Sequence, residues 1–153
     1  MNNWNTSRLN RFIPFFLAFI TLLLLTLFSR ISYAEARPAV ADRVIAYSGD
    51  LRVKVWTLRI GDRKAQEALV QIEDADHDWN LVIQKMKITR VNDALHYSVS
   101  QGNKRHVVLI LKQNRGQLFL PNEPDPITLH YSETLSQSGD AQMFLNHYLA
   151  NKK

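Results

Sequence analysis

Hydrophobic and polar residues alternate along most of residues 43–132, which is the pattern of β-strands with one buried face. The alternation is clear where Leu95, Tyr97 and Val99 occupy every second position of one segment. Residues 64–73 fit helical spacing as well as strand spacing, and we favour a strand there. The pattern therefore predicts a mainly β domain.

The connections between these segments are mostly short turns, such as Asn92-Asp93 and residues 101–104. The longest irregular connection is residues 121–126, where three prolines in six positions argue against a paired strand. Parallel strands would need crossovers of about a dozen residues, which this spacing scarcely allows. We therefore expect an antiparallel meander of about seven strands, folded as a small barrel or as a strongly bent sheet or sandwich.

One segment departs from simple alternation. Apolar residues occupy positions 51, 53 and 55 and then positions 56, 58 and 60, so the pattern skips one step between Val55 and Trp56. A skipped step is typical of a β-bulge, where an extra residue reverses which side chains face the core. We expect a bulge at this point.

The C-terminal residues change to helical spacing. The side chain of Asp140 can accept hydrogen bonds from the first backbone N–H groups of a helix that follows it. Apolar and aromatic side chains then share one side of that helix, at Met143, Phe144, His147 and Tyr148. The sequence therefore predicts a C-terminal amphipathic helix packed on the sheet.

The N-terminal segment has the composition of an export signal. Residues 12–28 carry no charge and follow Arg8 and Arg11. Ser32 and Ala34 supply the small residues of a cleavage site that ends at Ala34. The alternative is an uncleaved inner-membrane anchor formed by residues 12–28. In both cases the domain that follows is expected outside the cytoplasm.

We therefore expect a signal peptide at residues 1–34, a short polar leader at residues 35–42 and a single exported domain at residues 43–153. Removing residues 1–34 from the 153 leaves 119, enough for one domain with its own core. The chain has no cysteine, which excludes disulfides and thiolate metal sites. An exported domain without cystines fits a bacterial periplasm better than eukaryotic secretion.

The charge balance argues against nucleic acid as a partner. The formal net charge of +5 falls to +2 for residues 35–153, which contain 16 Lys+Arg and 14 Asp+Glu, because three arginines lie in residues 1–34. A nucleic-acid-binding domain would show a strong excess of basic residues. We expect membrane contact only through residues 12–28, if they are not cleaved.

No metal site is predicted. Asp74, Asp76 and Asp78 resemble the start of an EF-hand calcium loop, but Trp79 and Lys85 stand where such a loop needs Gly and Glu. We interpret this segment as a hydrated turn.

Histidines and nucleophiles do not form a catalytic pattern either. His96 and His130 could meet if their strands were neighbours, but a metal needs three or four converging ligands. The sequence contains no GxSxG or SxxK motif. We predict no cofactor and no catalytic residue, although carboxylates brought together by the fold would not be visible from sequence.

A set of basic residues at outward strand positions is the first candidate interaction surface. An anionic envelope polymer or an acidic protein surface would suit it. The leading hypothesis is therefore a non-enzymatic envelope or periplasmic accessory protein that binds another envelope component, as an adaptor, inhibitor or immunity-type factor. The residues are Arg52, Lys54, Arg59, Lys85 and Lys87.

An apolar cavity inside the predicted barrel is the second candidate site. Its lining would include Tyr97, Val99, Leu109 and Tyr131, which share the inward face of their strands. This gives the alternative hypothesis of a carrier for a small apolar ligand or lipid. A hydrolase with carboxylates hidden from sequence is third.

Overall fold

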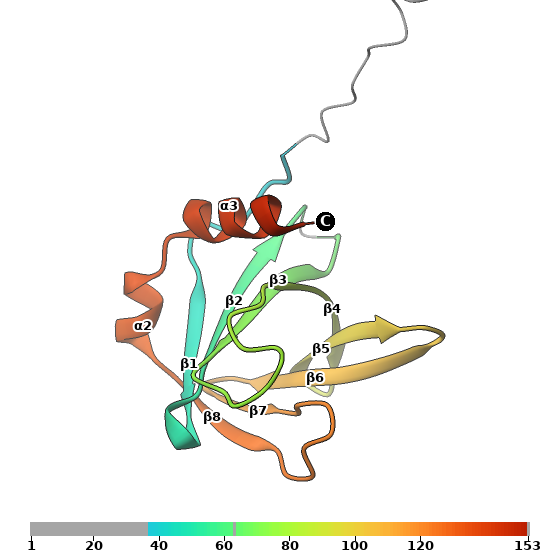
Figure 1. Cartoon of the computed structure of the whole chain (residues 1–153). Helices are drawn as coiled ribbons and strands as arrows, with labels where there is room; N and C mark the ends of the chain where they lie inside the picture. The colour runs from blue at the N-terminus through green and yellow to red at the C-terminus, as the bar shows by residue number, and fades with distance from the viewer. Residues whose placement is uncertain (1–36, 63, 153) are drawn as a thin grey trace, which may run out of the picture. The chain divides into compact units, whose positions relative to one another are not determined.

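The structure, a computed structural model, describes residues 37–62 and 64–152. It contains a closed antiparallel barrel in which each strand pairs with the next and β1 closes against β8 (Figure 1). The predicted mainly β fold and small barrel are confirmed, with eight strands. The strands are β1 (Ile45–Gly49), β2 (Lys54–Ile60), β3 (Glu67–Glu73), β4 (Gln84–Val91), β5 (Ala94–Gln101), β6 (Lys104–Lys112), β7 (Arg115–Leu118) and β8 (Ile127–Tyr131).

Alternate connections of an antiparallel barrel lie at the same end. One end carries the β2–β3, β4–β5 and β6–β7 turns, and the opposite end carries the β1–β2, β3–β4, β5–β6 and β7–β8 connections. The β4–β5 turn is the predicted Asn92-Asp93, where both residues have positive φ (44° and 64°) as in a type I′ hairpin. The β1–β2 connection contains the short 3₁₀ segment η2 (Asp50–Arg52).

Side chains fill the middle of the barrel. Leu109, Leu118 and Leu129, from three neighbouring strands, have no exposed surface. The rings of Tyr47 and Tyr131 meet edge to face with centroids 6.0 Å apart. An eight-stranded barrel is just narrow enough for side chains to occupy its interior, and this packing separates its two ends.

Strand β2 is buried on both faces. Its registers with β1 and β3 run without a shift, so the bulge predicted between Val55 and Trp56 is wrong. Val55 belongs to the barrel core, whereas Leu58 and Ile60 belong to a second cluster on the outer face. The apparent skipped step in the sequence therefore arises because apolar residues occupy both faces of β2, and not because of a bulge. The register shift in this barrel lies between Tyr97 and Ser98 in the pairing of β5 with β6.

Two helices follow β8. The predicted C-terminal helix is α3 (Ala141–Asn151), and Asp140 caps it by accepting bonds of 2.8 Å from the backbone N–H groups of Gln142 and Met143. A shorter helix, α2 (Glu133–Ser138), precedes it and was not predicted.

The buried face of α3 differs from the predicted one. Ala141 and Leu145 are buried against β2 and β3, with Phe144 and Tyr148 packed beside them. Met143 is exposed, as is His147. The apolar stripe is therefore rotated from the expected face, because Ala141 and Leu145 set its centre.

The segment before β1 is tied to the end of β2. Ala41 N donates to Arg59 O (2.9 Å), and Gly61 N donates to Ala39 O (2.7 Å). Ala39 and Ala41 belong to the polar leader predicted at residues 35–42. The predicted signal peptide or anchor, residues 1–34, lies outside the described residues. Within the described ranges, no helix has the length and apolar character needed to span a bilayer.

Candidate functional site

A cavity of about 770 Å³ opens at the end of the barrel that carries the β2–β3 and β4–β5 turns. Three arginines line it, Arg43, Arg59 and Arg90, and we call this end the arginine end. The buried part of the lining comes from Thr57, Ile88 and Tyr97. The remaining lining residues are Ala41, Asp42, Ile45, Gln66 and Leu95.

Strand period explains why three arginines distant in sequence meet here. Side chains two residues apart on a strand share a face. Arg59 follows Thr57 on the inward face of β2, and Arg90 follows Ile88 on the inward face of β4. Arg43 has the same parity as the inward positions of β1. At the end of the barrel these inward positions reach water, so long charged side chains fit there.

The cavity is electropositive. Among the described residues, no carboxylate oxygen lies within 4.0 Å of a guanidinium nitrogen of Arg43, Arg59 or Arg90, and all three side chains are exposed. Asp42 lines the same cavity and offsets part of the charge. Hydrogen bonds from Tyr131 and Gln137 lower the pKa of Glu133, and the charge of Arg43 also contributes to this lowering. The guanidinium groups of Arg59 and Arg90 face the cavity without a carboxylate partner in the described chain and are suited to bind carboxylate or phosphate.

Tyr97 lies under this charged rim, with 6% of its surface exposed. Burial, with a smaller contribution from Tyr47, raises the pKa of Tyr97 to about 12, although its hydrogen bond with Thr57 and the charge of Arg59 act in the lowering direction. Thr57 Oγ1 in turn donates to Ile45 O at 3.1 Å. The Tyr97 hydroxyl therefore stays neutral at ordinary pH.

The five basic residues predicted as one surface are divided by the fold. Arg52 lies in η2, whereas Arg59 lines the cavity at the other end of the barrel. Lys54, Lys85 and Lys87 are on the outer wall, where Lys87 lies opposite Glu67 in the β3–β4 register. The structure thus brings Arg59 together with Arg43 and Arg90 instead of with the lysines.

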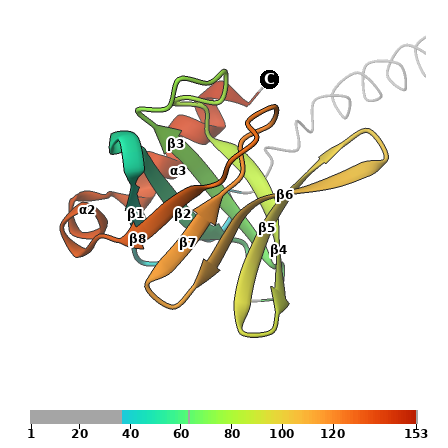
Figure 2. The same ribbon diagram turned by 90° about the horizontal axis from the view of Figure 1, so that it is seen from below.

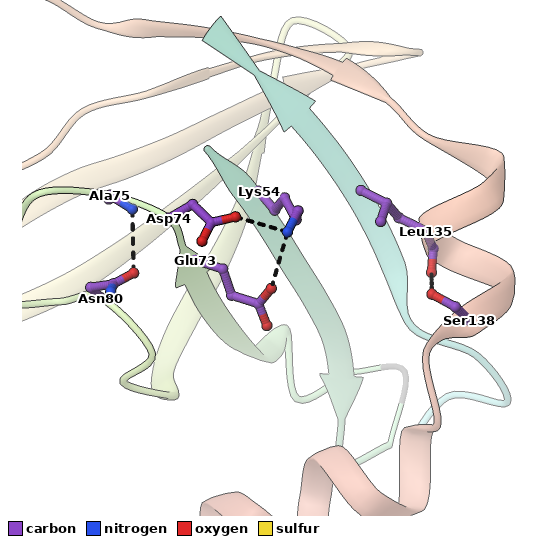
Figure 3. A network of polar contacts seen from close by, with 7 residues as sticks. All are labelled: Lys54, Glu73, Asp74, Ala75, Asn80, Leu135 and Ser138. Atoms are coloured by element: carbon purple, nitrogen blue, oxygen red, sulfur yellow. Dashed lines mark hydrogen bonds and ion pairs between the residues drawn. The ribbon is translucent and has the colours of Figure 1, made fainter. Parts of the chain in front are cut away.

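Two of those lysines have acidic partners. Lys54 Nζ lies 2.8 Å from Asp74 Oδ2 and 4.0 Å from Glu73 Oε2 (Figure 3). Lys85 Nζ lies 3.0 Å from Glu67 Oε1. These contacts reduce the positive charge that the outer wall can offer to an anion.

The four residues predicted to line a cavity all take part in the barrel core, and only one of these four lines the cavity at the arginine end. That residue is Tyr97. Leu109 is fully buried, and Val99 and Tyr131 pack against the core cluster. The predicted interior is therefore solid in its middle and hollow at its end.

The acidic segment after β3 is a turn held by its own side chains and by one contact with the β7–β8 loop. His77 Nε2 lies 3.0 Å from Pro121 O, and His77 Nδ1 accepts from Trp79 N at 3.0 Å. Asn80 Oδ1 accepts from Ala75 N at 3.3 Å (Figure 3). Within the described chain, no group of three or more His, Asp or Glu side chains is placed to hold a metal ion.

The histidine pair considered from sequence does not form. His96 is on β5 and His130 is on β8, and these strands are not neighbours in the barrel. Each histidine also follows the outward parity of its strand, while Tyr97 and Tyr131 beside them pack inward. The condition for the two histidines to meet, that their strands be neighbours, is therefore not fulfilled.

Sequence reasoning missed Arg43 and Arg90 as site residues. The signal for Arg90 was present, because it continues the inward alternation of Met86 and Ile88 on β4. A charged residue that continues an inward apolar row marks the point where a strand leaves the core. The same rule finds Arg59 after Val55 on β2.

Comparison of the chain with protein-family models, curated protein sequences and solved structures finds no match. Functional interpretation therefore rests on the geometry of the barrel.

Proposed function

We propose that this protein is an exported, non-enzymatic binding protein that holds a compact anionic ligand with an apolar part in the arginine end of its barrel. The observation that carries the proposal is the group of three arginines around a cavity whose buried part is formed by Ile88, Tyr97 and the hydroxyl side chain of Thr57. Binding sites for small molecules commonly have volumes of about 300–1,000 Å³, with a few charged groups that fix orientation.

The chemistry of the cavity sets the ligand class. The exposed guanidinium groups favour a carboxylate, sulfate or phosphate at the rim. Ile88, Leu95 and Tyr97 favour a hydrocarbon or ring below it. Because Leu109, Leu118 and other side chains fill the middle of the barrel, the apolar part of the ligand must be short.

This proposal is the carrier hypothesis with a charge requirement added. An accessory protein that binds an anionic envelope component is the second candidate, and it is favoured by the same arginines, since an exposed anionic group of a polymer could reach the rim. A hydrolase is the third. The lowering of the Asp74 pKa by its hydrogen bond with Lys54 runs in the opposite direction to the tuning of a general acid.

Calorimetric titration with decanoate tests the ligand class, on protein purified after expression of the full chain. We expect saturable binding of decanoate and no comparable binding of decyltrimethylammonium, whose tail is one carbon longer and whose charge is opposite. Inorganic phosphate distinguishes an anion site from a site that also needs the tail. Equal binding of the cationic and anionic amphiphiles would overturn the proposal.

Arginine variants test the location. Arg59→Gln and Arg90→Gln should each weaken decanoate binding about tenfold, the size expected for loss of one charged hydrogen bond. Arg52→Gln is the matched control, because Arg52 is exposed in η2 at the opposite end of the barrel. Unchanged affinity in both cavity variants would place the ligand elsewhere.

The proposed location, a bacterial periplasm, has its own test. Intact-mass measurement of periplasmic protein should give a chain that begins at Glu35 if the signal is cleaved after Ala34. A full-length mass in the membrane fraction would indicate the inner-membrane anchor instead. Recovery from the cytosol at full length would contradict export.

A further inference from the structure

The β5–β6 hairpin extends beyond the barrel as a two-stranded arm (Figures 1 and 2). Pairing of β5 with β4 stops at Ser98, and pairing of β6 with β7 stops at Leu109. From there to the Gly102-Asn103 turn, the ladders of the described chain join the two strands only to each other. We define residues 100–106, beyond the buried Ser98 and the partly buried Val99, as the arm. An isolated two-stranded ribbon with two open edges is marginally stable in water, so burial against another surface would stabilise it.

The arm is cationic and has an apolar residue at its base. Lys104, Arg105 and His106 are exposed along one strand, and residues 100–106 include no Asp or Glu. Val107 has 40% of its surface exposed at the base of the arm. A partner surface therefore needs negative charge together with some apolar area.

A groove with this character lies at the same end of the barrel, between η2, the β3–β4 loop and the β7–β8 loop. Its volume is about 590 Å³, and its apolar lining includes Leu51, Val53, Leu120 and Ile127. Leu51 has 85% of its surface exposed, which leaves a large apolar side chain beside the groove uncovered. The acidic residues that line the groove are Asp50, Asp74, Asp76, Glu123 and Asp125. We call this end of the barrel the acidic end.

We propose that the arm of one copy docks into the acidic-end groove of a second copy, forming a two-fold symmetric dimer. Arm and groove lie at the same end, so a two-fold axis across this end makes both contacts at once, each copy giving an arm and receiving one. Charge complementarity and the exposed Val107 and Leu51 supply the attraction. This inference is independent of the ligand proposed for the arginine end.

Within one chain the two surfaces stay apart. Among the described residues, no salt bridge joins Lys104 or Arg105 to a carboxylate of the groove. Asp74 is held by Lys54, which leaves Asp50, Asp76, Glu123 and Asp125 to receive the arm. Both views show the arm directed away from the barrel (Figures 1 and 2).

Edge-to-edge pairing of two arms is the less favourable arrangement. It would bring Lys104 and Arg105 of one arm toward the same residues of the other, and like charges on neighbouring strands are destabilising. Docking into the groove places these cations beside carboxylates instead.

Sedimentation velocity of the purified protein over a range of concentrations tests the proposal. We expect a reversible dimer that weakens when salt is raised to about 0.5 M, because the attraction is largely electrostatic. The arm-reversed variant Lys104→Glu/Arg105→Glu and the groove-reversed variant Asp76→Lys/Glu123→Lys/Asp125→Lys, in which three lysines outnumber the remaining Asp50, should each associate at least about a hundredfold more weakly. The control variant Lys112→Glu/Arg115→Glu makes the same change of charge as the arm-reversed variant, but at the arginine end, and it should still dimerise.

A mixture of the two reversed variants gives the sharpest test. The negative arm of one variant then faces the positive groove of the other, and both contacts of the dimer are again complementary. We expect a one-to-one heterodimer from two chains that are each monomeric alone and that keep the unfolding temperature of the parent. A wild-type chain that stays monomeric at all concentrations, or a mixture that does not associate, would overturn the proposal. An arm that captures only a polyanion such as heparin would do so as well.

Discussion

The arginine end and the acidic end belong to one barrel of eight strands but present opposite charges. At the arginine end the charge comes from inward strand positions that continue past the core. At the acidic end two connections are long, β3–β4 and β7–β8, and the charge comes from these loops and from η2. A barrel can therefore carry two unrelated surfaces because its packed middle isolates them.

This difference has a practical meaning for mutagenesis. A change in the filled middle affects the whole molecule, whereas a change at either end should be felt at that end alone. Effects of substitutions separated by more than about 10 Å and sharing no contacts are usually additive.

The largest expected effect comes from Tyr97→Ala, which removes the ring between the arginine-end cavity and the core. We expect a loss of about 3 kcal/mol in unfolding free energy, as for other large aromatic-to-alanine changes in cores. Chemical denaturation measures it. Tyr97→Phe keeps the ring and should cost about 1 kcal/mol for the lost hydrogen bond. A loss of unfolding free energy below about 1 kcal/mol in both variants would mean that Tyr97 does not support the core.

Alkaline pH should destabilise the molecule through the same residue. The unfolded chain releases the Tyr97 proton near pH 10, while the folded chain holds it up to a pKa of about 12. The stabilisation is therefore complete below pH 10 and is lost as pH rises toward 12. The free energy of unfolding, measured by denaturation at several pH values between 10 and 12, should fall less steeply with pH in Tyr97→Phe than in the parent. Identical slopes would contradict the buried, neutral hydroxyl.

Asp140→Ala should have a smaller effect that leaves both ends unchanged. It removes the acceptor of two backbone N–H bonds at the start of α3, with an expected cost of about 1 kcal/mol. Asp140→Asn retains a capping oxygen and is the matched control. Denaturation measures stability, and decanoate binding checks the arginine end. A large change in binding would show that α3 and the cavity are coupled.

The smallest effect is expected at the acidic end from Lys54→Met. The hydrogen bond from Lys54 lowers the Asp74 pKa, and its loss should let that pKa rise toward its ordinary value. In the parent, the contribution of Asp74 to stability is present above its unfolded pKa and is lost as pH falls through the lowered folded pKa. Carboxyl NMR titration measures the change. An unmoved Asp74 pKa would mean that the ion pair does not persist in solution.

Local features of the fold were predictable from sequence. The alternation of Leu95 and Tyr97, the Asn92-Asp93 turn and the Asp140 cap each depend on neighbouring residues, and the structure contains all three. Residues 121–126 form the predicted irregular connection, because proline cannot donate to a strand ladder.

The arginine end was not predictable in the same way. Arg43, Arg59 and Arg90 meet because β1, β2 and β4 surround one end, and this closure depends on pairings between distant strands. The bulge predicted in β2 also misplaced Arg59. A bulge at Val55 would have turned Arg59 outward beside Lys54, whereas continuous pairing turns it inward. Burial of both faces of β2 by core and helix is a tertiary effect that alternation alone cannot reveal.

Closure of the ring between the first and last strands also governs when the molecule can finish folding. Tyr47 on β1 lies opposite Tyr131 on β8, and Leu58 on β2 shares a buried cluster with Leu145 on α3. A chain delivered N-terminus first, by a ribosome or through a membrane pore, has neither partner available until its last residues emerge. Its tertiary structure is therefore expected to form late and as a unit.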